Sequence, residues 1–60
     1  MKVTFEFERE TKNTYRYAEA DSDASTEIVI GTLYIKKRAM RELTGEPGPA
    51  QVLTVTIEVV

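Results

Sequence analysis

The chain has 60 residues and a formal net charge of −2, and it contains neither cysteine nor histidine. The missing residue types exclude disulfides, thiolate metal sites and nucleophile–histidine catalysis, so we expect a non-enzymatic protein with no cofactor and no metal. A chain this short buries only about 60% of its unfolded surface. We therefore expect a single domain over residues 1–60, stabilised by assembly into a homodimer or larger oligomer.

The first two predicted strands alternate apolar and polar residues. Residues 3–10, VTFEFERE, place Val3, Phe5 and Phe7 on one face, which is typical of a half-buried strand. Residues 14–20, TYRYAEA, form a second strand with Tyr15 and Tyr17 on one face. Residues 11–14 have the composition of a turn, so the two strands are predicted to form a hairpin.

Two loop lengths are compatible with this hairpin. A two-residue loop, residues 12–13, would place Arg9 opposite Arg16, and like charges directly opposed are unfavourable. A three-residue loop, residues 12–14, would pair Arg16 with Glu10 and would bring both tyrosines onto the phenylalanine face. We therefore predict the three-residue loop.

Residues 21–26, DSDAST, are predicted to be a polar loop. Asp21 and Asp23, with Glu19 and Glu27 nearby, offer oxygen ligands for a hard cation. The loop has no glycine and no acid at the far end that a calcium loop requires. We interpret these carboxylates as a solvated surface.

The segment of residues 27–37, EIVIGTLYIKK, is apolar on both sides of an extended strand. Its two faces would carry Ile28, Ile30 and Tyr34 on one side, and Val29, Leu33 and Ile35 on the other. A strand covered on both faces reads as a nearly continuous apolar run, and sixty residues supply little material to cover two faces. We therefore predict that a second copy or a protein partner covers this strand, with an interface at Ile28, Ile30 and Tyr34.

The remaining residues predict one short helix and one strand. In residues 37–45, KRAMRELTG, the apolar residues are spaced for one side of a helix that ends at Gly45. Residues 46–49, EPGP, interrupt regular structure, and residues 51–59, QVLTVTIEV, alternate as a strand. The fold class is therefore mainly β with one short helix (β-β-β-α-β) and a four-stranded, mostly antiparallel sheet. The predicted core consists of Val3, Phe5, Phe7, Val29, Leu33, Ile35, Leu53, Val55 and Ile57.

Four of the eight basic residues form one cluster, which consists of Lys36, Lys37, Arg38 and Arg41. Such a cluster could contact phosphates, and exposed aromatic rings could stack on the bases of a single strand. The residues of this alternative are the basic cluster with Tyr15, Tyr17 and Tyr34. An ordinary solvated surface and an aromatic core explain the same residues, and seven acids in residues 1–27 disfavour nucleic acid.

The N-terminal residues alternate apolar with charged side chains, unlike the apolar core of a signal peptide. No apolar run approaches the roughly 20 residues that span a bilayer. We therefore expect a soluble cytoplasmic protein without membrane contact.

Two segments carry resemblances. The residues ETKNT (10–14), followed by GTLYI (31–35), resemble small uncharacterised prokaryotic and phage proteins, a similarity that implies no activity. Residues 33–57 resemble the strand, helix, strand unit of swapped-hairpin transcription factors of the AbrB type, which are DNA-binding dimers. Lys36 stands where that family typically has proline, and residues 47–49 interrupt the link. For this chain the resemblance implies dimerisation and not DNA binding.

The sequence thus leaves two hypotheses for function. The first is a non-catalytic protein-interaction module that forms a homodimer, because the two-faced segment is a stronger signal than four basic residues. The alternative is a nucleic-acid-binding module that uses the basic cluster and the tyrosines.

Overall fold

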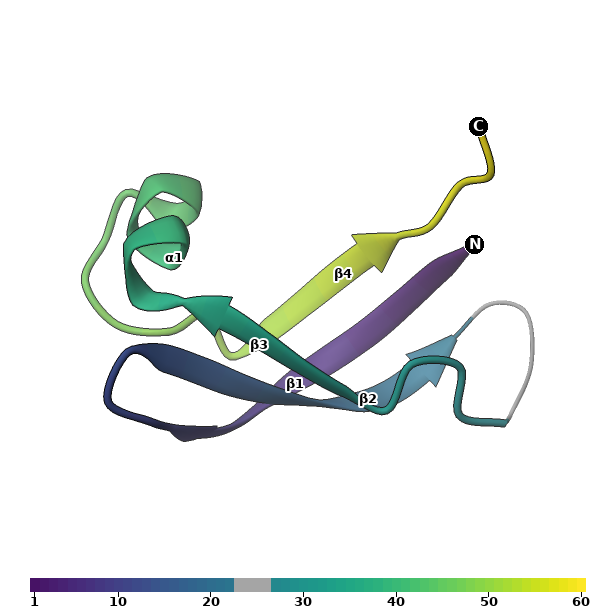
Figure 1. The fold of residues 1–60 in the computed structure, drawn as a ribbon, viewed down its shortest axis with the longest axis horizontal. Coiled ribbons are helices and arrows are strands. Elements are labelled where there is room, and N and C mark those ends of the chain that lie inside the picture. Colours follow the sequence, from purple (N-terminus) through teal and green to yellow (C-terminus); the bar gives the residue numbers. More distant parts are fainter. Residues whose placement is uncertain (23–26) are drawn as a thin grey trace.

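The computed structural model describes residues 1–22 and 27–60 (Figure 1). Its elements in chain order are β1 (Lys2–Glu10), β2 (Thr14–Ser22), β3 (Thr32–Lys36), α1 (Lys37–Thr44) and β4 (Val52–Thr56). All neighbouring strands are antiparallel, and they form one curled sheet in the order β3-β2-β1-β4. The predicted fold class is confirmed, and β3 and β4 form the two edges of the sheet.

One face of the sheet is apolar because side chains alternate along each strand. The cross-strand pairs on this face are Val3 with Val55, Phe5 with Leu53, Phe7 with Tyr17, Tyr17 with Leu33, and Tyr15 with Ile35. The helix lies over one end of this face and adds Met40 to the core. The opposite face is largely polar, with rows such as Glu6, Ala18 and Thr32.

The predicted core is correct for the residues in strands and wrong for two others. Val29 and Ile57 are exposed, at 40% and 37%, because neither lies within a strand. Within the described residues, the most buried apolar side chains are Val3, Phe5, Tyr15, Tyr17 and Met40. The predicted loop over residues 21–26 is wrong for residues 21 and 22, because β2 continues through Ser22, and residues 23–26 lie outside the described residues.

The hairpin turn has two residues, so the predicted three-residue loop is wrong. Thr11 and Thr14 close the turn: the Thr11 N–H donates to the Thr14 carbonyl at 2.8 Å, and their hydroxyl oxygens lie 2.6 Å apart. Arg9 is consequently opposite Arg16, the pairing that charge repulsion disfavours. Arg16 Nε lies 2.9 Å from a Glu8 carboxylate oxygen, although this N–H is not directed at it, so the contact is ionic.

A β-bulge at Glu8 brings the tyrosines to the apolar face despite the shorter loop. Glu8 has no opposite residue, because the register shifts between Phe7 and Arg9. An extra residue in one strand moves the following side chains to the other face and increases the local twist. Both tyrosine rings therefore pack edge-on against Phe7, with centroids 6.0 Å (Tyr15) and 5.9 Å (Tyr17) from the Phe7 ring.

Tyr17 connects the sheet, the helix and the segment before β4. Its ring is fully buried, and its hydroxyl donates to the Ala50 carbonyl at 2.7 Å, with Met40 Sδ at 3.9 Å. Burial raises the pKa of the Tyr17 hydroxyl, with a smaller contribution from the neighbouring Tyr15. This hydrogen bond joins residues 33 positions apart and fixes the path of the chain into β4.

We predict that Tyr17→Phe lowers the free energy of unfolding by about 1 kcal/mol, because it removes the donor to a part-buried carbonyl. Chemical denaturation measures the change. Tyr34→Phe is the matched control, since Tyr34 is 56% exposed and its hydroxyl can bond to water. Equal losses in the two variants would contradict a structural role for the Tyr17 hydroxyl.

Candidate interaction surface

The outer edge of β4 presents backbone groups that no other described residue pairs with. At the two ends of β4, hydrogen bonds join Met1 with Ile57 and the Phe7 N–H with the Gln51 carbonyl. In an antiparallel ladder these bonded positions alternate. Residues 51, 53, 55 and 57 therefore bond to β1, and residues 52, 54 and 56 direct their N–H and C=O groups away from the sheet.

The sequence of this edge has none of the features that usually prevent strand addition. Residues 51–57, QVLTVTI, contain no charged residue, no proline and no glycine. Natural edge strands are normally protected by charges, proline, bulges or a covering element. β4 also keeps the same register with β1 over all five of its residues, without a bulge. It is therefore a regular, uncharged strand with one open side.

The opposite edge, β3, is more restricted. Lys36 at its end carries charge, and helix α1 begins at the next residue. The Lys37 N–H donates to the Asn13 carbonyl at 3.0 Å, which holds the start of the helix against the hairpin turn. The helix thus limits strand addition at the C-terminal end of β3.

Residues 27–31 do not form the predicted strand, so the expectation of a strand over residues 27–37 is wrong for this part. The Glu19 carboxylate accepts backbone N–H groups from Val29 at 2.9 Å, Ile30 at 2.6 Å and Gly31 at 3.0 Å. Gly31 has φ +95°, a conformation that favours glycine. A side chain therefore satisfies the donors that a strand ladder would otherwise use.

The hydrogen bonds from Gly31, Ile30 and Val29 lower the pKa of the Glu19 carboxyl, with that of Gly31 contributing most. We call this set of hydrogen bonds from Val29, Ile30 and Gly31 to the Glu19 carboxylate the Glu19 cradle. The cradle leaves Ile28 exposed at 69% and Ile30 at 39%. Tyr34, the third predicted interface residue, lies within β3, is 56% exposed and has the Arg16 guanidinium 5.9 Å from its ring centroid. All three predicted residues are thus accessible on the β3 side, but they do not form one strand face.

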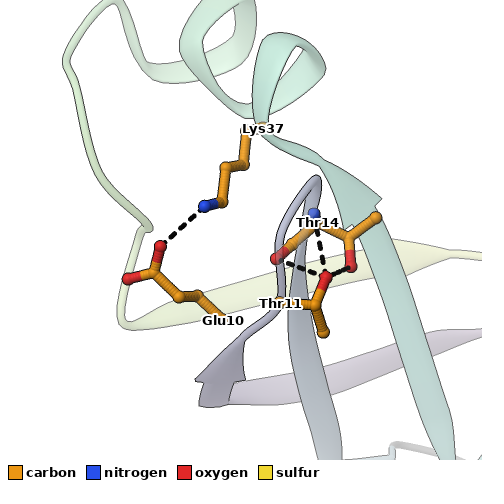
Figure 2. A network of polar contacts seen from close by, with 4 residues as sticks. All are labelled: Glu10, Thr11, Thr14 and Lys37. Carbon is orange, nitrogen blue, oxygen red and sulfur yellow. Dashed lines mark hydrogen bonds and ion pairs between the residues drawn. The ribbon is translucent and has the colours of Figure 1, made fainter.

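The basic cluster gathers around the start of α1. Lys37, Arg38 and Arg41 line a pocket of about 290 Å³ together with Tyr15 and Gly48, and Lys36 lines a neighbouring pocket. Two of these charges already have partners. Lys37 Nζ lies 2.7 Å from Glu10 Oε2, and Arg38 Nε lies 3.8 Å from Glu42 Oε1. Figure 2 shows Lys37 extending from α1 toward Glu10, beside the turn closed by Thr11 and Thr14.

The three tyrosines are separated by the fold. Tyr15 is 7% exposed and Tyr17 is fully buried, so neither presents a free ring face for stacking on a base. Lys37 Nζ also lies 5.5 Å from the centroid of the Tyr15 ring. Only Tyr34 of the three is exposed, and it lies on the sheet face opposite the buried tyrosines.

Sequence reasoning did not identify the outer edge of β4 or the Glu19 cradle. The uncharged run of residues 51–57 was a signal for the former, because it lacks protection, but only the strand order shows that β4 is at an edge. Glu19 gave no signal, since its partners are 10 to 12 residues away and bond through their backbone.

The chain matches no protein-family model, and no curated protein or solved structure matches it either. In residues 1–22 and 27–60, no three acidic side chains lie close enough to hold a metal ion, and Asp23 of the proposed carboxylate group lies outside these ranges. The helix of the described part is neither long nor apolar enough to cross a membrane.

We predict that Glu19→Gln destabilises the protein at neutral pH and that this difference from the wild type shrinks in acid. The folded-state pKa of Glu19 is lowered, so its stabilisation is complete above the ordinary glutamate pKa of about 4.3 and is lost as pH falls toward the folded-state value. Urea unfolding midpoints across this pH range measure the effect. Glu6→Gln on the polar face is the control, and an equal loss there would contradict the cradle.

Proposed function

We propose that this protein is a non-catalytic protein-interaction module that binds another protein chain by strand addition at the outer edge of β4. In this mode the backbone of the added strand supplies hydrogen bonds, and alternate side chains supply specificity. The observation that carries the proposal is a five-residue, uncharged edge strand whose outward backbone groups bond to none of residues 1–22 and 27–60. Natural proteins avoid such edges unless they are covered, because they promote uncontrolled association.

The exposed side chains next to this edge support the same proposal. Val52 is 56% exposed and Ile57 is 37% exposed, and Leu53 and Val55 are only half-buried on the apolar face. A strand added beside β4 would cover Leu53, Val55 and Ile57 further on the apolar face and Val52 on the opposite face. On the β3 side, Ile28 and Ile30 provide a second exposed apolar contact region.

We predict that Thr54→Pro abolishes association while leaving the fold intact. The Thr54 N–H points away from β1, so proline removes no bond of the existing sheet but blocks a bond to an added strand. Thr32→Pro is the matched control, because Thr32 occupies an equivalent outward position in the β3 edge. Affinity capture followed by mass spectrometry compares the wild type with both variants, and circular dichroism verifies their folding.

The expected result is that stable associates, including further copies of this chain, are recovered by the wild type and Thr32→Pro and are lost with Thr54→Pro. If Thr54→Pro unfolds the protein, Thr54→Lys is the variant to use instead, because it places a protective charge at the same edge. Association that survives a folded Thr54 variant, or that is lost only with Thr32→Pro, would contradict strand addition at β4.

A nucleic-acid-binding module is the second candidate, and the pocket at the start of α1 favours it. Lys37 and Arg38 occupy the first turn of the helix, where the macrodipole disfavours cations and a bound anion would offset them. The buried tyrosines weigh against this candidate, because they remove two of its three stacking rings. Glu10 and Glu42 further reduce the charge of the pocket.

This second candidate predicts binding of a labelled random single-stranded oligonucleotide that weakens steeply with salt. Fluorescence anisotropy at low and physiological salt measures it. Reversing Arg38 and Arg41 to glutamate should abolish the binding, whereas the Thr54→Pro variant should bind as well as the wild type. Affinity that is unchanged in the Arg38/Arg41 double variant would exclude the basic cluster.

A further inference from the structure

We infer that the strand added to β4 is β4 of a second copy, paired antiparallel about a twofold axis at Thr54, so that two chains form one eight-stranded sheet. The inference rests on the proposed function and specifies its partner. A twofold contact is self-complementary, and it closes after two chains. Such a contact requires that the outward positions of β4 in one copy lie opposite the outward positions of β4 in the other copy.

The backbone of β4 meets this requirement. In a pairing centred on Thr54, the Thr54 residues of the two copies lie opposite one another, and Val52 lies opposite Thr56 of the second copy. These are the outward positions, since residues 51, 53, 55 and 57 bond to β1. All five residues of β4 are therefore used, and the outward N–H and C=O groups of both strands find partners.

The side chains match on the apolar face. Leu53 would lie opposite Val55 of the second copy, and Leu53 and Val55 already pair with Phe5 and Val3 of their own chain. The row across the dimer would read Phe5, Leu53, Val55, Val3, with the last two from the second copy. It is apolar throughout, so the half-buried β4 side chains would lose water on joining the two cores.

The polar face is also compatible with this pairing. The two Thr54 side chains would lie directly opposite each other, and threonine pairs are favourable on a sheet. The row through Val52 would carry Glu6 of one copy and Lys2 of the other at its ends. No like charges are brought together, because residues 51–57 contain no charge.

The β3 edge offers a poorer alternative partner. A head-to-tail contact of β3 with β4 of the next copy would leave an open edge at each end and would form chains of unlimited length. Helix α1 and the charge of Lys36 also restrict the length of β3 that a second strand could reach. The β4 pairing leaves both β3 strands at the outer edges of the dimer, with their helices free of the contact.

A cysteine scan tests the pairing with unusual clarity because the chain contains no cysteine. Thr54→Cys should form a disulfide-linked dimer under mild oxidation, since directly opposite residues of a bonded antiparallel pair have Cα atoms about 5.5 Å apart, within the disulfide range. Thr32→Cys at the β3 edge is the matched control and should remain monomeric on non-reducing gels.

Two further variants test the register. Thr56→Cys alone should not cross-link, because its counterpart in the second copy lies several residues away along the strand. Mixed with Val52→Cys, it should give the mixed disulfide. Self-linked Thr56→Cys without self-linked Thr54→Cys would overturn the pairing about Thr54. Efficient linkage between Thr32→Cys and Thr54→Cys would overturn the twofold dimer in favour of a head-to-tail contact.

Sedimentation velocity of the wild type over a concentration series completes the test. A dimer that dissociates on dilution and is lost in Thr54→Pro supports the inference, whereas a monomer up to about 1 mM overturns it. Failure here is distinguishable from failure of the proposed function. A monomeric protein that still captures a different chain in a Thr54-dependent manner retains strand addition and loses only the second copy as its partner.

Discussion

The structure depends on the burial of Tyr17 at the centre of a single apolar sheet face. Its ring packs on Phe7, and its hydroxyl is bonded to the Ala50 carbonyl. A hydroxyl removed from water needs such a partner, so the segment that precedes β4 must pass over the tyrosine at this point. The position of β4 beside β1, and thus the location of the open edge, follows from this constraint.

The structure gives a different physical reason for expecting a protein partner from the one that the sequence suggested. The sequence suggested a strand with two apolar faces, whereas one face of the sheet is largely polar and the apolar face is partly covered by the curl of the sheet and by α1. In the described residues, the groups that lack a partner are the outward backbone N–H and C=O groups of β4 rather than the side chains of a second apolar face. An unprotected edge favours association by hydrogen bonds, which are directional and therefore fix a register.

The fold could be predicted from local pattern, but the register and the cradle could not. Alternation in residues 3–10 and 51–59 identified β1 and β4, and Gly45 ends α1 with φ +73° as its position indicated. Repulsion between Arg9 and Arg16 led to the wrong loop length. In the structure the two arginines can lie opposite each other because the carboxylate of Glu8, at the bulge, compensates the charge of Arg16. Bulges and long-range side-chain-to-backbone bonds leave no periodic signal in a single sequence.

Of the predicted site residues, the fold brings Lys37, Arg38 and Arg41 to one pocket and leaves Ile28, Ile30 and Tyr34 accessible. It removes Tyr15 and Tyr17 from the surface, because packing on Phe7 buries both rings. The predicted three-residue loop placed these tyrosines on the correct face for the wrong reason, because the bulge at Glu8 rather than the loop brings them there. The β4 edge emerges only from strand order, which depends on contacts distant in sequence.

Amide hydrogen exchange of β4, followed by NMR at low and high protein concentration, would show whether the outer edge of β4 is the interaction site. The inward N–H groups of Leu53 and Val55 should be protected at both concentrations, because they bond to β1. The outward N–H groups of Val52, Thr54 and Thr56 should gain protection as the concentration rises. Outward groups that exchange equally fast at both concentrations, in a protein that shows no other partner, would contradict β4 as the interaction edge.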